Sequence, residues 1–478
     1  MLRPTPTLTG IALAAALVAG AGPTSAAGAL PGAVPAPNAV GTLAAVPSVQ
    51  QLLVPTVAAN TRIKSVLPKR TRKKILGKRF TMSVFDTEVG EFVYKRRSKA
   101  ALRGASTTKI LTTIGALTLL GPEHRFPTTV RQGSTPDEIV LVAGGDPLLT
   151  SANLRALARR TAAALTSASA AAGQASPAPA ASGSPEPSAS GLPATSDPDP
   201  SNAPTEPPAR RITVRADDSL FSGSGQSRGW PNFYLPNEVR PVGAFARDDR
   251  KVRDATRDTG AYFAAALRAA GVPATYSGEG VAGTDAATLA SYRGHRLAKA
   301  VSRTLLVSDN DTAEMLFRHI AVARGLPGTW DGARQALTDT LTELGVPMRR
   351  VQIIDGSGLS LDGRLTARAL TAALALALSA DHPELARLRG WLPVAGRTGT
   401  LQAAYLRFTA KRARCAAGLV QAKTGTLADS IALAGYAAGA DGHTKVFVSI
   451  VNSRPTRYSR LTTRKAVDRV VSGITGCW

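Results

Sequence analysis

Cysteine, histidine and aromatic residues are scarce in this sequence of 478 residues, and each shortage narrows the possible functions. The five histidines are scattered, and none belongs to a helical pair of histidines that could bind a metal. We therefore expect no metal site and no cofactor. Aromatic residues make up only 5% of the chain, and no basic-aromatic RNA-binding signature is present. Nucleic acid is therefore the least favoured partner.

The two cysteines, Cys415 and Cys477, allow only one intramolecular disulfide. An even number of cysteines in an exported protein suggests a bridge, because oxidising compartments favour disulfides. Two independent thiols are the alternative.

Acidic residues are also few, at 33 against 58 lysines and arginines, so the formal net charge is +25. This surplus predicts attraction to an anionic surface, such as an anionic cell-wall polymer or an anionic membrane. A basic run at 69–74 contributes to this positive charge, although such a run is most often only a solvent-exposed surface. No later stretch is typical of a transmembrane helix, so any membrane contact would be peripheral.

The N-terminus is typical of an export signal. Arg3 precedes an apolar run at 11–21, and small residues at 24–27 would permit cleavage after Ala26 or Ala27. We therefore expect a signal peptide at 1–27, a flexible spacer at 28–50 and an exported, extracytoplasmic protein that is cell-wall associated or secreted. A retained anchor is the alternative, although the apolar run is short for a membrane span.

Secondary-structure patterns predict a mixed α/β protein. A β-hairpin is expected at 80–94, strands at 139–142 and 212–214, and helices at 297–306 and 311–323. Two adjacent strands at 431–436 and 445–451 and a closing helix at 462–471 follow. The segment at about 166–208 is rich in Ala, Ser and Pro and has few large apolar residues. Such a composition cannot bury enough surface to fold, so a disordered loop is expected there.

Ser106 and Lys109 lie three residues apart at the start of a predicted helix that ends at Gly121-Pro122. Residues at this spacing are neighbours on a helix, so the hydroxyl and the amine can touch. An amine beside a hydroxyl is the arrangement of a serine nucleophile with a lysine base. Taken alone, the pair is more often an N-cap serine and a surface lysine.

Two later segments favour the catalytic interpretation. Ser308-Asp309-Asn310 and Lys423-Thr424-Gly425 follow Ser106-x-x-Lys109 in the order found in penicillin-binding proteins and class A β-lactamases. Lys109 can take the proton of Ser106 only if its amine is neutral, which burial or a nearby cation such as Lys423 would favour. Ser308 can relay a proton, and Asn310 can hold the substrate amide or the Lys109 amine.

The third segment also supplies groups that can bind a substrate. Lys423, Thr424 and Thr426 offer a positive charge and hydroxyls to a carboxylate. Gly425 would let a substrate backbone approach the strand closely. Backbone N–H groups of Ser106 and Thr426 could form an oxyanion hole.

The chain resembles the D-alanyl-D-alanine carboxypeptidase/endopeptidase family, peptidase family S13, of class C low-molecular-mass penicillin-binding proteins. The resemblance covers roughly residues 80 to 455. Beyond the three segments above, it rests on Gly144-Gly145-Asp146-Pro147, Asp218-Ser219-Leu220-Phe221, Ala313-Glu314, Asp355-Gly356-Ser357-Gly358-Leu359-Ser360 and Leu392-Pro393-Val394-Ala395-Gly396.

The resemblance implies a β-lactamase/DD-peptidase-like fold, with a five-stranded antiparallel sheet flanked by helices and a smaller inserted domain. We expect 51–135 and 295–478 to form the penicillin-binding domain and 136–294 the inserted domain. The family often has a second inserted module, for which this chain has too little sequence. Family members often favour a free amine on the stem peptide, which Asp217 or Asp218 could bind, unless both acids merely cap a turn.

The expected function is a serine-type D-Ala-D-Ala carboxypeptidase that acts on peptidoglycan stem peptides through an acyl-enzyme and is acylated by β-lactam antibiotics. DD-endopeptidase cleavage would be the same chemistry with a larger leaving group. A β-lactamase is one alternative, although no clear Glu-x-x-x-Asn segment of the class A type is present. A non-catalytic cell-wall binding protein is the other.

Overall fold

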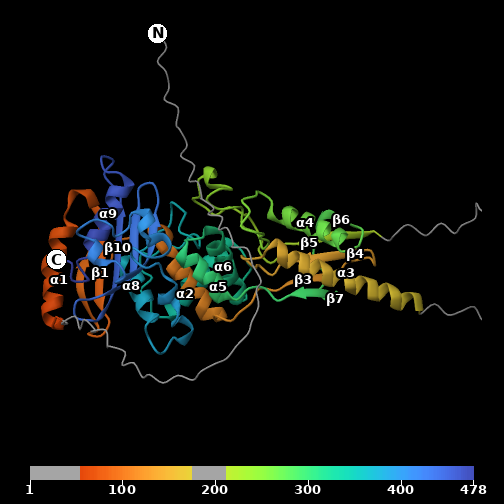
Figure 1. Cartoon of the computed structure of the whole chain (residues 1–478), viewed down its shortest axis with the longest axis horizontal. Coiled ribbons are helices and arrows are strands. Elements are labelled where there is room, and N and C mark those ends of the chain that lie inside the picture. The colour runs from red at the N-terminus through yellow and green to blue at the C-terminus, as the bar shows by residue number, and fades with distance from the viewer. Residues whose placement is uncertain (1–53, 175–210) are drawn as a thin grey trace, which may run out of the picture. The chain divides into compact units, whose positions relative to one another are not determined.

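The structure is a computed structural model that describes residues 54–174 and 211–478. The expected signal peptide, the spacer and most of the low-complexity segment lie outside the described residues. The described residues form two five-stranded sheets with helices packed against them (Figure 1). None of the described helices is both long enough and apolar enough to cross a membrane.

The first sheet is antiparallel throughout, which confirms the expected fold class. Its strands run in the order β2 (Glu91–Arg96), β1 (Arg79–Asp86), β10 (Thr444–Asn452), β9 (Ile431–Ala438) and β8 (Val420–Thr426). The expected hairpin is β1 and β2, and the two strands expected to be adjacent are β9 and β10. Strand β8, which carries Lys423, therefore lies at the edge of the sheet.

This sheet is buried on both faces, as strand β10 illustrates. Val446, Val448 and Ile450 enter one hydrophobic core, whereas Phe447 and Val451 enter the other, because successive side chains of a strand point to opposite faces. Figure 1 shows helices on both sides: α1 (Thr56–Thr71) and α9 (Arg460–Val471) on one, and α8 (Ala367–Leu376) and α2 (Thr108–Leu120) on the other.

Helix α2 is a central helix of the core that contains Val446, Val448 and Ile450. Ten of its 13 residues are buried, as the absence of charge after Lys109 predicts. It packs against α5 (Leu297–Leu306), α6 (Asn310–Ala323) and α7 (Trp330–Glu343). The sequence patterns predict α5 and α6, whereas α7 is not predicted.

The second sheet is mixed and has the order β6 (Ala274–Glu279), β5 (Ile212–Asp217), β4 (Glu138–Val142), β3 (Thr128–Gln132) and β7 (Thr288–Tyr292). Strand β5 is parallel to β4 and β6, and β3 is antiparallel to its two neighbours.

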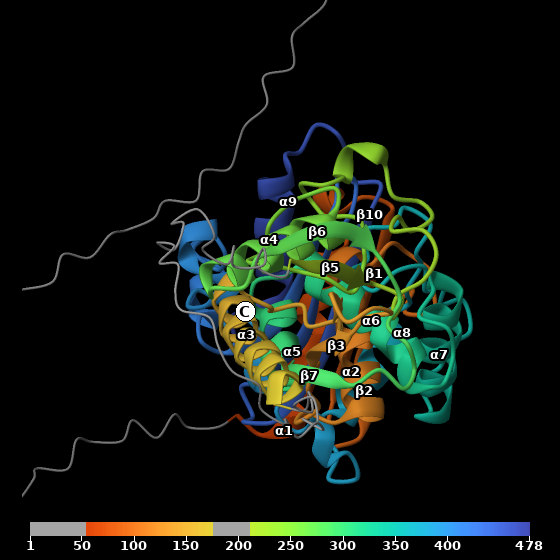
Figure 2. The same cartoon turned by 90° about the vertical axis from the view of Figure 1, so that its right-hand side faces the viewer.

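Helices α3 (Ser151–Gln174) and α4 (Ala255–Ala269) pack side by side against the second sheet (Figure 2). Residues 166–174, which were expected to begin the disordered loop, are the last turns of α3. Alanine is the best helix former, and its abundance there lets the helix continue although little apolar surface is available. The rest of that loop, 175–208, lies outside the described residues.

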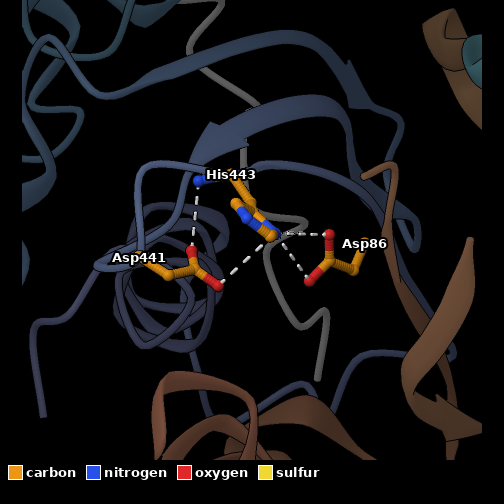
Figure 3. A group of neighbouring side chains, drawn as sticks. All are labelled: Asp86, Asp441 and His443. Carbon is orange, nitrogen blue, oxygen red and sulfur yellow. Dashed lines mark hydrogen bonds and ion pairs between the residues drawn. The ribbon is translucent and has the colours of Figure 1, made fainter. Parts of the chain in front are cut away.

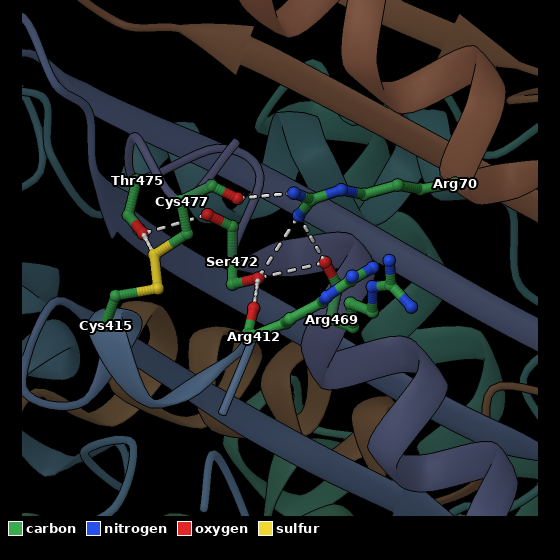
Figure 4. The surroundings of a disulfide bond; sticks show 7 residues. All are labelled: Arg70, Arg412, Cys415, Arg469, Ser472, Thr475 and Cys477. Carbon is green, nitrogen blue, oxygen red and sulfur yellow. Dashed lines mark hydrogen bonds between the residues drawn. A yellow bond between two sulfur atoms is a disulfide. The ribbon is translucent and has the colours of Figure 1, made fainter. Parts of the chain in front are cut away.

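The disulfide Cys415–Cys477 is present, with 6.1 Å between the Cα atoms, which confirms the expected bridge (Figure 4). It joins the short helix Arg414–Ala416 to the end of the chain after α9. The Arg70 guanidinium in α1 donates hydrogen bonds to the backbone oxygens of Arg469 and Cys477. Helix α1 is therefore linked by hydrogen bonds to α9 and to Cys477 of the disulfide.

A buried ionic cluster fastens α1 to the first sheet. The Lys445 ammonium contacts the carboxylates of Asp86 and Asp441. The Nδ1 atom of His443 lies 3.1 Å from Asp86, and Figure 3 shows His443 between the two carboxylates. The Asn60 amide of α1 donates to Asp86 over 2.9 Å. Asp86, Asp441 and His443 are the only such group of three potential metal ligands among the described residues. The Lys445 ammonium already provides the positive charge that the two carboxylates need.

Candidate active site

Ser106 lies in a tight turn immediately before α2, the 3₁₀ segment Ala105–Thr107. It does not serve as the N-cap: the cap position is Thr107, and no side chain there caps the helix. The preceding residue Ala105 has φ +47°, which is a left-handed conformation that costs a non-glycine residue about 1 kcal/mol or more. The turn thus presents a half-exposed Ser106 hydroxyl at the end of a buried helix.

Two glycines allow neighbouring segments to approach this turn. A Cβ atom at Gly358 would lie 2.0 Å from the carbonyl oxygen of Ala105, and one at Gly425 would lie 2.7 Å from that of Gly104. Gly425 therefore lets the turn that carries Ser106 come close to β8, and its expected role toward a substrate backbone stays a prediction. These contacts hold Ser106 between the 355–360 loop and the edge strand.

Lys109 is fully buried, and its ammonium nitrogen has three polar neighbours. The nitrogen lies 3.1 Å from Ser106 Oγ, 2.7 Å from Asn310 Oδ1 and 3.0 Å from the Ser357 carbonyl oxygen. Burial lowers the pKa of Lys109 to about 8, although nearby carboxylates, Glu314 foremost, act to raise it. A substantial neutral fraction near neutral pH is what a general base requires.

Glu314 lies behind Lys109 and was not predicted as a site residue. It is fully buried in α6, and its two carboxylate oxygens accept the backbone N–H groups of Gly356 and Ser357 over 2.7 and 2.8 Å. Burial raises its pKa to about 8. Glu314 thereby fixes the Ser357 carbonyl that accepts from Lys109. In the sequence, this role is indicated only by the position of Glu314 one helical turn after Asn310, on the same helix face.

Asp355 holds the same loop from the other side. Its buried carboxylate accepts the Trp230 indole N–H over 2.7 Å and the backbone N–H groups of Gly358 and Ser360 over 2.9 and 2.7 Å. Burial raises the pKa of Asp355. The 355–360 segment, which in the sequence supports only the resemblance, therefore forms a rigid wall behind Lys109.

Asn310 connects Lys109 to a loop of the 223–241 region. It begins α6, and its amide nitrogen donates to the Glu238 carbonyl over 2.8 Å while its amide oxygen faces Lys109. Ser308 has φ +64° and lies just outside the helix, where the Asp309 carboxylate caps α6 through the Thr312 N–H. The second predicted segment is thus brought to the first, as expected from the sequence.

Lys423 is fully buried on β8, and its ammonium donates to the Thr424 carbonyl over 3.0 Å. Burial, assisted by the charge of Lys109, lowers its pKa well below the usual value. The Thr424 hydroxyl donates to Thr400 Oγ over 2.8 Å, and Thr426 is exposed at the strand end. These hydroxyls lie on the edge strand, next to the turn that holds Ser106.

Asp217 is the last residue of strand β5 of the second sheet, and Asp218 follows it. Asp217 accepts the backbone N–H groups of Ser219 and Ala282 over 3.0 and 2.9 Å. Asp218 accepts those of Ala244 and Phe245 over 2.7 and 3.0 Å, and burial raises its pKa to about 6. Neither carboxylate forms a hydrogen bond with the residues around Lys109.

The fold and the arrangement around Lys109 are those of a serine–lysine acyl-transfer enzyme built on the penicillin-binding protein scaffold. The sequence profile of the D-Ala-D-Ala carboxypeptidase 3 (S13) family matches residues 63–165 and 234–473. The chain belongs to this family and is a serine-type D-Ala-D-Ala carboxypeptidase, a peptidase hydrolase.

Named relatives agree with this assignment. The chain is 29% identical to carboxypeptidase DacB of Mycolicibacterium smegmatis over 83% of its own length and 80% of that protein. It is 28% identical to a D-alanyl-D-alanine carboxypeptidase of Actinomadura sp., over 80% and 79% of the two chains. Penicillin binding protein 4 of Haemophilus influenzae shares the fold, with a TM-score of 0.66 and 16% identity over 85% of this chain and 98% of that one.

Proposed function

We propose that Ser106 is the nucleophile of the carboxypeptidase reaction and that Lys109 is its general base. The observation that carries the proposal is the single nitrogen of Lys109, which contacts Ser106 Oγ and Asn310 Oδ1 while its pKa is lowered by burial. Lys109 takes the hydroxyl proton as Oγ attacks the carbonyl carbon of the penultimate D-Ala. Collapse of the tetrahedral intermediate breaks the peptide bond, and the leaving amine receives a proton and departs as D-Ala.

The remaining predicted residues fit the later steps. Ser308, two residues before Asn310, relays the proton to the leaving amine, and water then hydrolyses the ester at Ser106. Backbone N–H groups of Ser106 and Thr426 stabilise the oxyanion. Lys423, Thr424 and Thr426 hold the substrate carboxylate, with Gly425 keeping β8 close to the nucleophile turn.

Peptidoglycan stem peptides are the proposed substrates, and β-lactam antibiotics the proposed acylating inhibitors. The family assignment supports both, and a solved structure of the Haemophilus influenzae relative is a complex with a β-lactam. Cleavage of cross-links as a DD-endopeptidase uses the same acyl-enzyme.

Asp217 or Asp218 remains the proposed contact for a free amine on the stem peptide. Each carboxylate oxygen of Asp217 already accepts a backbone N–H, so an ammonium there would have to share an oxygen. Asp218 accepts both of its backbone N–H groups at Oδ1, and its Oδ2 accepts neither of them. If either Asp binds that amine, replacing this Asp by Ala lowers kcat/KM for the peptide with the free amine. The kcat/KM for the peptide with the acetylated amine stays unchanged. Equal losses for both peptides would reject the role.

The domain division and the location of the protein are part of the proposal. The second sheet supports an inserted domain. Because strand β3 belongs to this sheet, it supports a domain that starts at Thr128 rather than at 136. Export by the N-terminal signal would place the enzyme with its substrate. The net charge of +25 supports an association with anionic cell-wall polymers.

The proposal is tested by exposing the full-length protein to penicillin and locating the adduct by mass spectrometry. We expect one adduct, on Ser106, together with release of D-Ala from a D-Ala-D-Ala peptide. An adduct on another serine would refute the site. Rapid turnover of penicillin without peptide hydrolysis would instead indicate a β-lactamase, and the absence of any adduct would indicate a non-catalytic binding protein.

A further inference from the structure

A concave surface remote in sequence from Ser106 is lined almost entirely by positive charge. This basic groove has a volume of about 770 Å³, and seven of its ten lining residues are lysine or arginine. The exposed cations are Arg72, Lys73, Lys74, Lys78, Arg79 and Arg457. They come from the end of α1, the short helix Lys74–Leu76, the start of β1 and the loop after β10. The basic run seen in the sequence thus becomes one wall of a groove.

The basic groove continues into a neighbouring one through the shared residue Lys73. This second groove, of about 380 Å³, adds the cations Arg70, Arg412, Lys465 and Arg469. Figure 4 shows Arg70, Arg412 and Arg469 beside the disulfide. Burial, and then the charges of Arg469 and Arg412, lower the pKa of Arg70, so these guanidinium groups repel one another. Together the two grooves form a cationic track lined by eleven lysine and arginine residues, which is more positive charge than a single small anion would match.

The track has no internal counter-charge. No acidic residue lines either groove, and within 54–174 and 211–478 none of its cations forms an ion pair. Elsewhere in the same structure arginines pair closely with acids, as Arg407 does with Asp468 and Arg247 with Asp258. Uncompensated like charges in a concave surface destabilise the protein and concentrate anions from solution.

We propose that this track binds a linear anionic polymer whose repeating units carry phosphodiester groups. Lysine and arginine both bind phosphate oxygens through charge-assisted hydrogen bonds, and several such contacts along a groove suit a chain of regularly spaced anions. No aromatic side chain lines either groove, so the stacking platform of a single-stranded nucleic acid site is absent from these described residues. The concave form also fits a strand better than the flat surface of a membrane.

The basic groove is connected to the nucleophile turn by hydrogen bonds. Ser453 lines the groove, and the adjacent Asn452 accepts the Arg103 N–H over 2.7 Å and donates to the Arg103 carbonyl over 3.0 Å. Arg103 directly precedes Gly104-Ala105-Ser106. A polymer held in the groove would therefore keep attached peptides near Ser106. The binding stands independently of the proposed function; only its effect on turnover rests on that function.

The test measures binding of poly(glycerol phosphate) to the full-length protein by calorimetry at increasing salt. The variant Lys73→Glu/Lys78→Glu/Arg457→Glu reverses three exposed groove charges. The matched control Arg293→Glu/Lys299→Glu/Arg349→Glu changes the net charge equally at exposed sites outside the track. We expect the groove variant to lose at least tenfold in affinity, the control less than twofold, and the affinity of the unaltered protein to fall steeply with salt.

Turnover provides the second readout. The groove variant should hydrolyse a short soluble D-Ala-D-Ala peptide and react with penicillin as the unaltered protein does, but lose at least fivefold in kcat/KM on peptides attached to a phosphodiester-bearing polymer. Equal losses of binding in both variants would overturn the proposal, because overall charge alone would then explain adsorption. Equal or tighter binding of an oligonucleotide or of anionic phospholipid vesicles would overturn it in favour of that ligand. Failure of penicillin to react would count against the proposed function and not against this site.

Discussion

The amide oxygen of Asn310 lies 2.7 Å from the Lys109 nitrogen, closer than the Ser106 hydroxyl at 3.1 Å. Asn310, 201 positions further along the chain than Lys109, thus contacts the amine that we propose as the general base. An amide oxygen accepts a hydrogen bond from either protonation state of the amine and adds no charge. Asn310 can therefore hold Lys109 in place without fixing it as an ammonium.

Replacing Ser106 by alanine should abolish both penicillin acylation and D-Ala release, because among the described residues no other hydroxyl forms a hydrogen bond with the side-chain nitrogen of Lys109. Ser308→Ala should leave acylation detectable but slower by roughly 10²-fold or more if Ser308 acts as a proton relay. Intact-protein mass spectrometry and a D-Ala release assay measure both. Undiminished acylation of the Ser106 variant would refute the assignment.

The rate of acylation should rise with pH and reach half its plateau near pH 8. Burial lowers the pKa of Lys109 to about 8, so the neutral amine is the minor form below this pH and the major form above it. Lys109→Arg should lose about 10²–10⁴-fold in rate at every pH, because a guanidinium does not deprotonate in this range. Stopped-flow acylation with a chromogenic β-lactam from pH 6 to 10 measures the profile. A flat profile would show that Lys109 is not the base.

Glu314 is expected to act as a positioning residue. Glu314→Gln retains one acceptor oxygen but turns an amide NH₂ toward a backbone N–H, which should displace Ser357 and slow acylation by about tenfold. Since the Glu314 carboxylate raises the pKa of Lys109, its loss should also move the pH midpoint to a lower value. The exposed Glu343→Gln is the matched control and should change neither. A slower rate with an unmoved midpoint would indicate only a structural role.

Removing the disulfide should lower stability without affecting the chemistry. The bridge closes a loop with a sequence separation of 62, which corresponds to about 4 kcal/mol in the chain-entropy model. The double variant Cys415→Ser/Cys477→Ser should lose stability of this order in urea unfolding while retaining its acylation rate. Equal unfolding midpoints for the two proteins would show that the bridge contributes little.

Much of this fold follows from local patterns in the sequence. The hairpin β1–β2, the adjacent strands β9 and β10, and helices α5 and α6 are predicted because their apolar residues recur at the period of their element. Strands β3, β6 and β7 of the second sheet are not predicted. Exposed and buried residues alternate in β6, but its segment contains Gly278 at φ +108° and little β-branched content, so the pairing with β5 decides its structure.

The candidate active site also contains both residues that the sequence predicts and residues that only the fold brings together. Ser106, Lys109, Ser308, Asn310 and Lys423 are recognised because their types and order match a known reaction, and the structure brings Lys109 into contact with both Ser106 and Asn310. The contacts of Glu314 and Asp355 depend on tertiary packing and could not be read from spacing alone. The close approach of Gly104 to Gly425 is likewise a tertiary contact that the sequence does not predict.

The edge position of β8 has a further consequence for solubility. The 393–395 segment covers only the first half of its outer side, where Ala422 donates to Pro393 and Ala395 to Val420. No described strand pairs with the outer side of 423–426. An open strand edge invites pairing with another molecule of the same protein. A peptide bound along these residues would shield that edge, so substrate and inhibitor should both act as protectants against self-association during storage and heating.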